Sequence, residues 1–144
     1  MLVSQILKTK AGQGVITVAP GASVAEAARL LSDRRIGAVI VSRDGEIPLG
    51  ILSERDIVRE LGQRGSGCLN DTVDGLMTTK LVSCVSGDLT DAVLQKMTDG
   101  RFRHMPVLNG GKMIGLISIG DVVKARLEEL HAEKDALEGM IKGF

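Results

Sequence analysis

The chain of 144 residues has no Trp, no Tyr and only two Phe. Proteins that bind single-stranded nucleic acids usually stack the bases on aromatic side chains, so this scarcity argues against that class of partner. The 18 Lys and Arg are balanced by 18 Asp and Glu, which leaves a net charge of zero. Because no overall positive field draws the chain to a polyanion, we expect neither a nucleic acid nor an anionic membrane as a partner.

Cysteine and histidine are also rare, with two of each. Cys68 and Cys84 lack the close spacing of zinc ligands, so we predict free thiols, no metal site and a reducing compartment. Lys8 interrupts the N-terminal apolar residues before they reach the length of a signal-peptide core. No run approaches the ~20 apolar residues of a membrane span. These absences predict a soluble, cytoplasmic protein.

Hydrophobic residues still make up 44% of the chain, and they belong to a sequence that repeats itself. The segment 3–10 resembles 73–80, the segment 15–17 resembles 81–83, and 50–56 resembles 115–121. Each copy is about sixty residues long, which is too short to bury a stable core alone, so the two copies should pack together.

Each copy shows the same pattern of elements. In the first copy, strands are predicted at 15–18, 38–41 and 49–52, with helices that begin near Ser23 and Ser53. The second copy has a helix around 90–97, strands at 105–108 and 113–117, and a helix from Ser118. The fold class is therefore α/β (α+β), with two β-α-β-β-α repeats packed through their sheets about a pseudo-twofold axis and two equivalent clefts. The predicted organisation is repeat 1 at 1–62, a linker at 63–71, repeat 2 at 72–128 and a C-terminal helical extension at 129–144.

The most specific motif is a doubled Gly-x-x-Ser-x-x-Asp, which ends at Asp56 in the first copy and at Asp121 in the second. It places Ser53 and Ser118 at helix starts, where free N–H groups and the helix dipole favour a phosphate. An Asp in the same turn can accept hydrogen bonds from both hydroxyls of a ribose. The alternative is that each motif is an ordinary helix cap.

Basic residues gather at 101–106, where two Arg and one His precede a predicted strand. This segment can bind a phosphate, or it can be a solvated turn whose Arg side chains pair with Asp91 or Asp99. Arg55 can also reach a phosphate, but its counterpart in the second copy is Gly120, so we expect clefts of unequal affinity. No nucleophile can be assigned to His104 as a catalytic base.

Beyond Asp121 the helix carries apolar residues at alternating spacings of four and three, namely Val123, Leu127, Leu130, Leu137, Ile141 and Phe144, with Lys134 among them. This heptad spacing is typical of helices that pair with a second helix. The alternative is a surface helix that covers its own core. The position of residues 129–144 beyond the second repeat favours a homodimer.

Taken together, these motifs resemble a known family, the tandem pair of cystathionine-β-synthase (CBS) domains, also called a Bateman module. The resemblance covers residues 1 to about 127 and rests on Thr17 with Pro20-Gly21, on Leu49–Val58, on Arg103–Val107 and on Ile114–Val123. It implies an adenosine-containing regulatory ligand such as AMP, ADP, ATP, NAD(H) or S-adenosylmethionine. In this family such pairs often pair again, and they usually regulate an attached enzyme, channel or transporter.

The resemblance also implies roles for individual residues. Asp56 and Asp121 match the positions that bind ribose, and Ser53 and Ser118 match those near phosphate. Further matching positions are Arg103 and His104 on the phosphate, Thr17 and Ser83 beside the adenine, and Met105 and Pro106 as walls of the pocket. In the first copy, residues 36–40 replace the Arg-His-Met-Pro pattern, so the resemblance does not define the phosphate side of the first cleft.

Three functions follow from these observations. The favoured one is a non-enzymatic, dimeric sensor in which a nucleotide enters the cleft near Asp121 and changes a surface read by an unknown protein in trans. The alternative is a structural dimerisation or adaptor module that works through the helix at 130–144 without a physiological nucleotide. A nucleotide hydrolase ranks last, because no carboxylate cluster, metal-ligand set or nucleophile–base pair is visible. The sequence leaves open which adenosine ligand binds and whether one or both clefts are filled.

Overall fold

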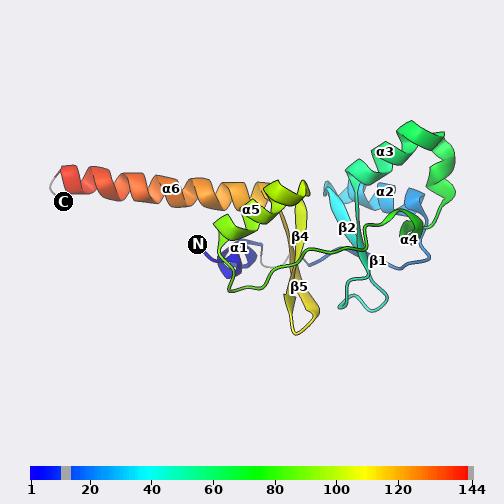
Figure 1. The fold of residues 1–144 in the computed structure, drawn as a ribbon, viewed down its shortest axis with the longest axis horizontal. Coiled ribbons are helices and arrows are strands. Elements are labelled where there is room, and N and C mark those ends of the chain that lie inside the picture. The colour runs from blue at the N-terminus through cyan, green and yellow to red at the C-terminus, as the bar shows by residue number, and fades with distance from the viewer. Residues whose placement is uncertain (11–13, 143–144) are drawn as a thin grey trace.

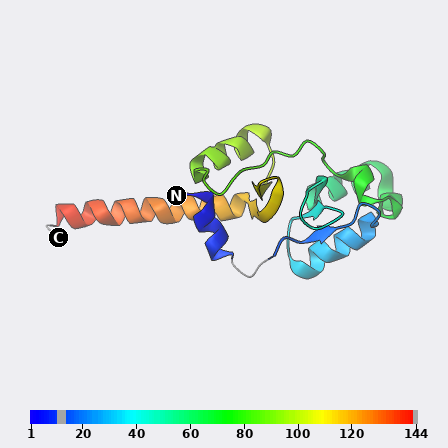
Figure 2. The same cartoon turned by 90° about the horizontal axis from the view of Figure 1, so that it is seen from below.

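The computed structural model describes residues 1–10 and 14–142. The elements in chain order are α1 (Val3–Thr9), β1 (Thr17–Val18), α2 (Val24–Arg34), β2 (Ala38–Val41), β3 (Gly50–Ser53), α3 (Glu54–Arg64), the 3-10 helix η1 (Gly65–Asn70), α4 (Val73–Leu76), α5 (Thr90–Gly100), β4 (His104–Asn109), β5 (Lys112–Ser118) and α6 (Ile119–Ile141). The elements form two small units that lie side by side (Figures 1 and 2). The predicted mixture of helices and short strands is confirmed.

Each unit contains a small sheet. In the first, β1 runs parallel to β2, and β2 runs antiparallel to β3 with Ala38 opposite Ser53. In the second, β4 and β5 form an antiparallel hairpin, and its turn at Gly110 and Gly111 has φ values of 61° and 82°. Glycine suits this turn because other residues rarely adopt positive φ. The strand expected before α5 is reduced to a single parallel bridge from Cys84 to Val107.

The first helix of each sequence repeat packs into the unit formed by the other repeat. Val3 and Ile6 of α1 belong to the buried cluster that contains Val93, Val107 and Ile117 of the second unit. Backbone hydrogen bonds hold this position, since the Val3 N–H donates to the carbonyl of Asp88 over 2.9 Å. The sequence analysis expected neither α1 nor α4, and it assigned each leading segment to its own repeat.

The same exchange occurs in the opposite direction. Val73 of α4 is buried with Val24, Val41 and Leu52 of the first unit. Its N–H donates to the carbonyl of Ala22 over 2.8 Å, at the position that corresponds to the Val3–Asp88 bond. The units that share a core therefore differ from the sequence repeats at their N-terminal ends, and the chain crosses twice between them.

The two units meet at the starts of β2 and β4. A Cβ atom at Gly37 would lie 3.0 Å from Cε1 of His104, so the imidazole lies directly against the glycine backbone. The hairpin turns also touch, because the Met113 N–H donates to the carbonyl of Glu46 over 2.7 Å. The contact between units thus places His104 at the boundary between the two sides of the molecule.

α6 is the longest element and projects away from both units (Figure 1). Its 23 residues correspond to about 35 Å of helix. Its first turns carry the buried residues Val122 and Ala125, whereas Leu130, Leu137 and Ile141 are 47%, 60% and 85% exposed. Phe144, the last position of the predicted seam, lies outside the described residues. Among residues 1–10 and 14–142, no helix is both long enough and apolar enough to cross a membrane.

Candidate functional site

Two hollows open where the units meet, and each contains one of the two Asp residues from the doubled motif. The first, which we term the Asp56 cleft, has a volume of about 430 Å³. The second, the Asp121 cleft, has a volume of about 520 Å³. His104 lines both hollows and forms part of the wall between them. Both volumes fall within the ~300–1,000 Å³ that is usual for small-molecule sites.

Local hydrogen bonds fix each Ser–Asp pair at a helix start. The Ser53 N–H donates to Asp56 Oδ2 over 2.9 Å, and the Asp56 N–H donates to Ser53 Oγ over 3.2 Å. Ser118 and Asp121 repeat this capping box with distances of 2.9 and 3.1 Å. The helix-cap interpretation is therefore confirmed. A capping role is compatible with ligand binding, because the cap uses only Oδ2 of each carboxylate and leaves Oδ1 out of the cap.

Each cleft combines the Ser–Asp pair of one repeat with the strand start of the other. The Asp56 cleft is completed by Arg101, Arg103 and His104 of the second repeat. The Asp121 cleft is completed by residues 34–38 of the first repeat, among them Arg34 and Arg35. The Arg-His-Met-Pro segment that repeat 1 lacks is thus supplied to the Asp56 cleft by repeat 2. Its absence from repeat 1 affects the cleft of Asp121, where the favoured hypothesis placed the nucleotide.

The Asp56 cleft is the more basic of the two. Its lining includes five basic side chains, namely Arg55, Arg59, Lys80, Arg101 and Arg103, against Glu54 and Asp56. Within residues 1–10 and 14–142, the one ion pair that involves these basic groups joins Arg59 to Asp56 Oδ1 at 3.4 Å. Asp99 instead accepts a hydrogen bond from Gln95, so the proposed pairing of the Arg residues with Asp91 or Asp99 does not form in the described part of the chain.

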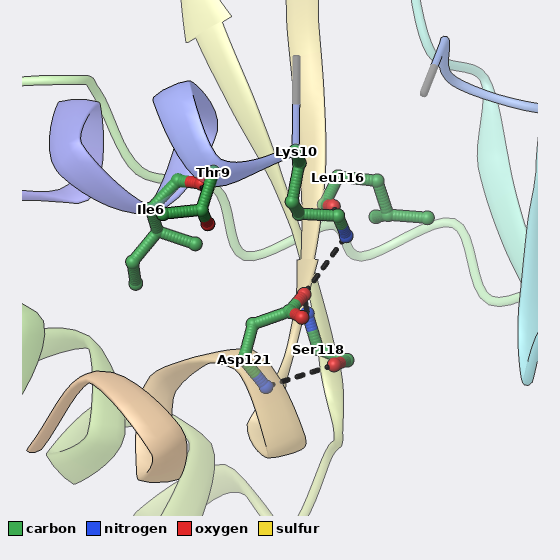
Figure 3. A network of polar contacts seen from close by, with 6 residues as sticks. All are labelled: Ile6, Thr9, Lys10, Leu116, Ser118 and Asp121. Carbon is green, nitrogen blue, oxygen red and sulfur yellow. Dashed lines mark hydrogen bonds and ion pairs between the residues drawn. The ribbon is translucent and has the colours of Figure 1, made fainter. Parts of the chain in front are cut away.

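In the Asp121 cleft, a lysine forms an ion pair with the Asp121 carboxylate (Figure 3). Lys10, at the end of α1, places its Nζ 2.8 Å from Asp121 Oδ2 and 2.8 Å from the carbonyl oxygen of Leu116. Burial works to raise the pKa of Asp121, but hydrogen bonds from Lys10 and from the Ser118 N–H hold that pKa below its ordinary value of 3.8. The Asp121 carboxylate is therefore charged and paired at neutral pH.

Burial favours the neutral form of His104. Burial lowers the pKa of its imidazole below the ordinary value of 6.5, and the nearby Glu54 carboxylate opposes this only in part. A neutral imidazole can donate one hydrogen bond and accept another, which suits a polar ligand atom more than a formal phosphate charge.

Three of the predicted site residues lie outside the two clefts. Met105 lines neither, because its side chain is fully buried in the core of the second unit. Thr17 and Ser83 each follow the lining segment by one position, since Val15 and Ile16 line one cleft and Leu81 and Val82 the other. Pro106 lines the Asp56 cleft.

Several lining residues were missed by the sequence analysis, above all Lys10 and Lys80. These two lysines occupy equivalent places in the repeat, and this was the signal that could have identified them. Arg35 was also missed, and it is equivalent in the repeat to Arg101 of the predicted basic segment. Both adopt the left-handed conformation that ends α2 and α5, with φ of 54° and 56°. Within residues 1–10 and 14–142, no group of three or more His, Cys, Asp or Glu side chains is arranged to hold a metal ion.

Comparison with known proteins identifies the repeats. The family model for the CBS domain matches residues 3–63 and 73–128. The structure of a CBS-domain containing protein from Agrobacterium tumefaciens is 44% identical, with a TM-score of 0.83 over 88% of this chain and 99% of that chain. The CBS domain protein from Pyrobaculum aerophilum complexed with AMP is 26% identical, with a TM-score of 0.78 over 92% of this chain and 99% of that one.

Among curated sequences, the mitochondrial CBS domain-containing protein CBSX3 of Arabidopsis thaliana is 34% identical over 84% of this chain. The chain covers 61% of that relative. The match thus concerns the CBS repeats and leaves more than a third of the relative without a counterpart.

Proposed function

The chain belongs to the CBS-domain family, and we propose that it is a non-enzymatic regulatory module that binds an adenosine-containing ligand and acts in trans on a partner protein. The observation that carries this proposal is the pair of composite clefts. In each, a Ser–Asp pair at a helix start faces basic side chains contributed by the other repeat. A bound ligand would touch both units and thereby respond to their relative position.

The Asp56 cleft offers the chemistry that a nucleotide needs. Asp56 Oδ1 meets only the exposed Arg59 within the described residues, so it can accept hydrogen bonds from the two hydroxyls of a ribose. Arg55, Arg101 and Arg103 can bind phosphate oxygens in pairs, since the guanidinium group presents two parallel N–H donors.

The charge of the Asp56 cleft favours ligands that carry phosphate. AMP, ADP, ATP and NAD(H) bring negative charge to a lining that is rich in Arg, whereas S-adenosylmethionine brings a cationic sulfonium. The relative from Pyrobaculum aerophilum, which is 26% identical, was solved with AMP and supports this ligand class. We therefore infer a phosphate-bearing adenosine compound in the Asp56 cleft.

Thermal melts and calorimetry with AMP, ADP, ATP, NAD, NADH and S-adenosylmethionine test the proposal. A ligand at one hundred times its Kd adds about 2.7 kcal/mol of stability, which for a chain of this size is about 9 °C. Asp56→Asn is the informative variant, because Asn keeps an oxygen that caps α3 but loses the negative charge. We expect this variant to fold and to lose the shift. The absence of a shift with all six ligands would refute nucleotide binding.

The exposed apolar side chains of α6 support a homodimer. Val123, Leu127, Leu130, Leu137 and Ile141, which we term the α6 strip, are all at least 41% exposed and follow the heptad spacing. Leu130→Glu combined with Leu137→Glu should convert a dimer into a monomer in light scattering and leave AMP binding intact. The control is Ala132→Glu, an exposed position on the same helix outside the α6 strip. A wild-type chain that is monomeric at ~100 µM would contradict the proposed dimer.

The α6 strip also favours the second candidate function, an adaptor that works through this helix without a nucleotide. Deletion of residues 129–144 separates the two. A nucleotide-binding module keeps its AMP-induced shift in melting temperature after the deletion. An adaptor shows no such shift before or after it and loses only its association with other chains.

A further inference from the structure

The two clefts differ at one pair of equivalent lysines. Lys10 reaches across from α1 to the start of α6, where its ammonium group bonds Asp121 Oδ2 and the Leu116 carbonyl at 2.8 Å each (Figure 3). Both partners of this ion pair are about three-quarters buried, with 25% and 26% of their side chains exposed. Such a pair is screened by water much less than an ion pair on the open surface.

Lys80 is the equivalent residue in the Asp56 cleft, but its ammonium group has different contacts. It is exposed and lines that cleft, and no ion pair joins it to Asp56 in the described residues. The carbonyl of Ile51, which corresponds to that of Leu116, accepts a hydrogen bond from the Thr78 N–H instead of from a lysine. Both lysines thus line their clefts, but within the described residues only Lys10 is bound to the carboxylate.

We propose that Lys10 decides which cleft takes the nucleotide: its ammonium group binds Asp121 Oδ2 and neutralises the carboxylate, so that the remaining oxygen, Oδ1, is a weaker acceptor for a ribose diol and the ligand fills the Asp56 cleft first. This inference rests on the proposed function and names one residue that makes the affinities of the two clefts unequal. A ribose diol at Asp121 has to share the carboxylate with Lys10 or displace it, and either outcome weakens the apparent affinity there.

The size of this effect follows from the strength of the bond. A hydrogen bond to a charged group contributes about 1.5–3 kcal/mol, and partial exposure places this one toward the low end. Since 1.4 kcal/mol corresponds to a tenfold change in affinity, we expect the Lys10 ion pair to weaken nucleoside binding in the Asp121 cleft about tenfold.

Site-resolved NMR titration of the full chain with adenosine and with AMP tests the inference. The amides of Ser53 and Ser118 donate to Asp56 and Asp121, so each reports on one cleft. Adenosine is the decisive probe because it has no phosphate that a released Lys10 could attract. The variant is Lys10→Met, which keeps the length of the side chain and removes its charge. Lys80→Met is the matched control.

In the wild type, the Ser53 amide should respond at lower AMP concentration than the Ser118 amide. In Lys10→Met, the adenosine midpoint at Ser118 should fall about tenfold while the midpoint at Ser53 stays the same, which also shows that the variant is folded. In Lys80→Met, the Ser118 midpoint should not move.

Two results would overturn the inference, and they are distinguishable. If Ser53 titrates but the Ser118 midpoint is unchanged or higher in Lys10→Met, Lys10 does not weaken diol binding at Asp121, and the proposed function stands. If neither amide responds to adenosine or AMP in any of the three proteins, nucleotide binding itself fails, and the role of Lys10 fails with it.

Discussion

The exchange of leading helices predicts where the effect of a core mutation will be felt. Val3 and Val73 are equivalent in the sequence repeat, and both side chains are fully buried. Val3 belongs to the core of the second unit and Val73 to that of the first. Val3→Ala should therefore disturb the unit built around β4 and β5, and Val73→Ala the unit built around β2 and β3.

The expected loss of unfolding free energy is the same for both variants. Loss of two buried methyl groups costs about 1.6 kcal/mol of transfer free energy, and the remaining cavity raises the total to about 2–3 kcal/mol. The entropy of unfolding for a chain of this size is about 0.3 kcal/mol per degree, so the melting temperature should fall by about 8 °C. Urea denaturation and thermal melts measure both quantities.

The location of the effect is measured by methyl NMR. Val3→Ala should shift the methyl signals of Val93, Val107 and Ile117, which share its cluster, and leave those of Val41 and Leu52 in place. The pattern should invert for Val73→Ala. Two results would contradict the packing of α1 in the second unit. One is that Val3→Ala disturbs Val41 and Leu52 instead, and the other is that it lowers the unfolding free energy by less than about 1 kcal/mol.

Three other predictions concern single sites. Gly50→Ala places a Cβ 2.5 Å from the Met77 sulfur and 3.0 Å from the Thr78 carbonyl, so urea denaturation should show a loss of about 1–3 kcal/mol. Burial raises the pKa of the Cys84 thiol to about 11, so it should react slowly with a disulfide reagent at pH 8 in the folded chain and rapidly in urea; fast reaction of the folded protein would contradict this. Although burial works to raise it, the pKa of Asp121 is held below 3.8 in the folded state, so its carboxylate stabilises the fold above about pH 4 and loses this contribution as the pH falls further. The unfolding free energy should therefore fall more steeply between about pH 5 and 3 in the wild type than in Lys10→Met, and equal slopes would argue against the Lys10–Asp121 bond.

Local patterns predicted the elements well because they depend on neighbours in the sequence. The caps at Ser53 and Ser118 and the strand at 38–41 follow from side-chain chemistry within a few residues. The short helix α1 was not predicted, since seven residues form a marginal helix without tertiary packing. Its stability comes from Val3 and Ile6, which are buried in a cluster whose next buried residue along the chain is Cys84.

The composition of the clefts was harder to predict for the same reason. The sequence places Arg101 and Arg103 in the same repeat as Asp121. In the folded chain, however, both of these Arg residues line the cleft of Asp56. Such a pairing depends on how the repeats are placed relative to each other, and no local pattern encodes this. The resemblance identified the right residue types, whereas only the fold shows which of them share a cleft.

The crossed arrangement links ligand binding to the shape of the whole molecule. A nucleotide in the Asp56 cleft would contact Asp56 from one unit and Arg103 from the other, so its binding free energy would depend on how the units are placed.

Asp121 lies in the first turn of α6, and Lys10 ties that turn to the end of α1. Opening of the Lys10–Asp121 bond would free the start of α6, which carries the exposed α6 strip. The equivalent bond is absent at Asp56 in the described residues, and the helix that begins there, α3, ends after eleven residues at Arg64. A ligand that opened the Lys10–Asp121 bond would therefore act directly on the start of α6.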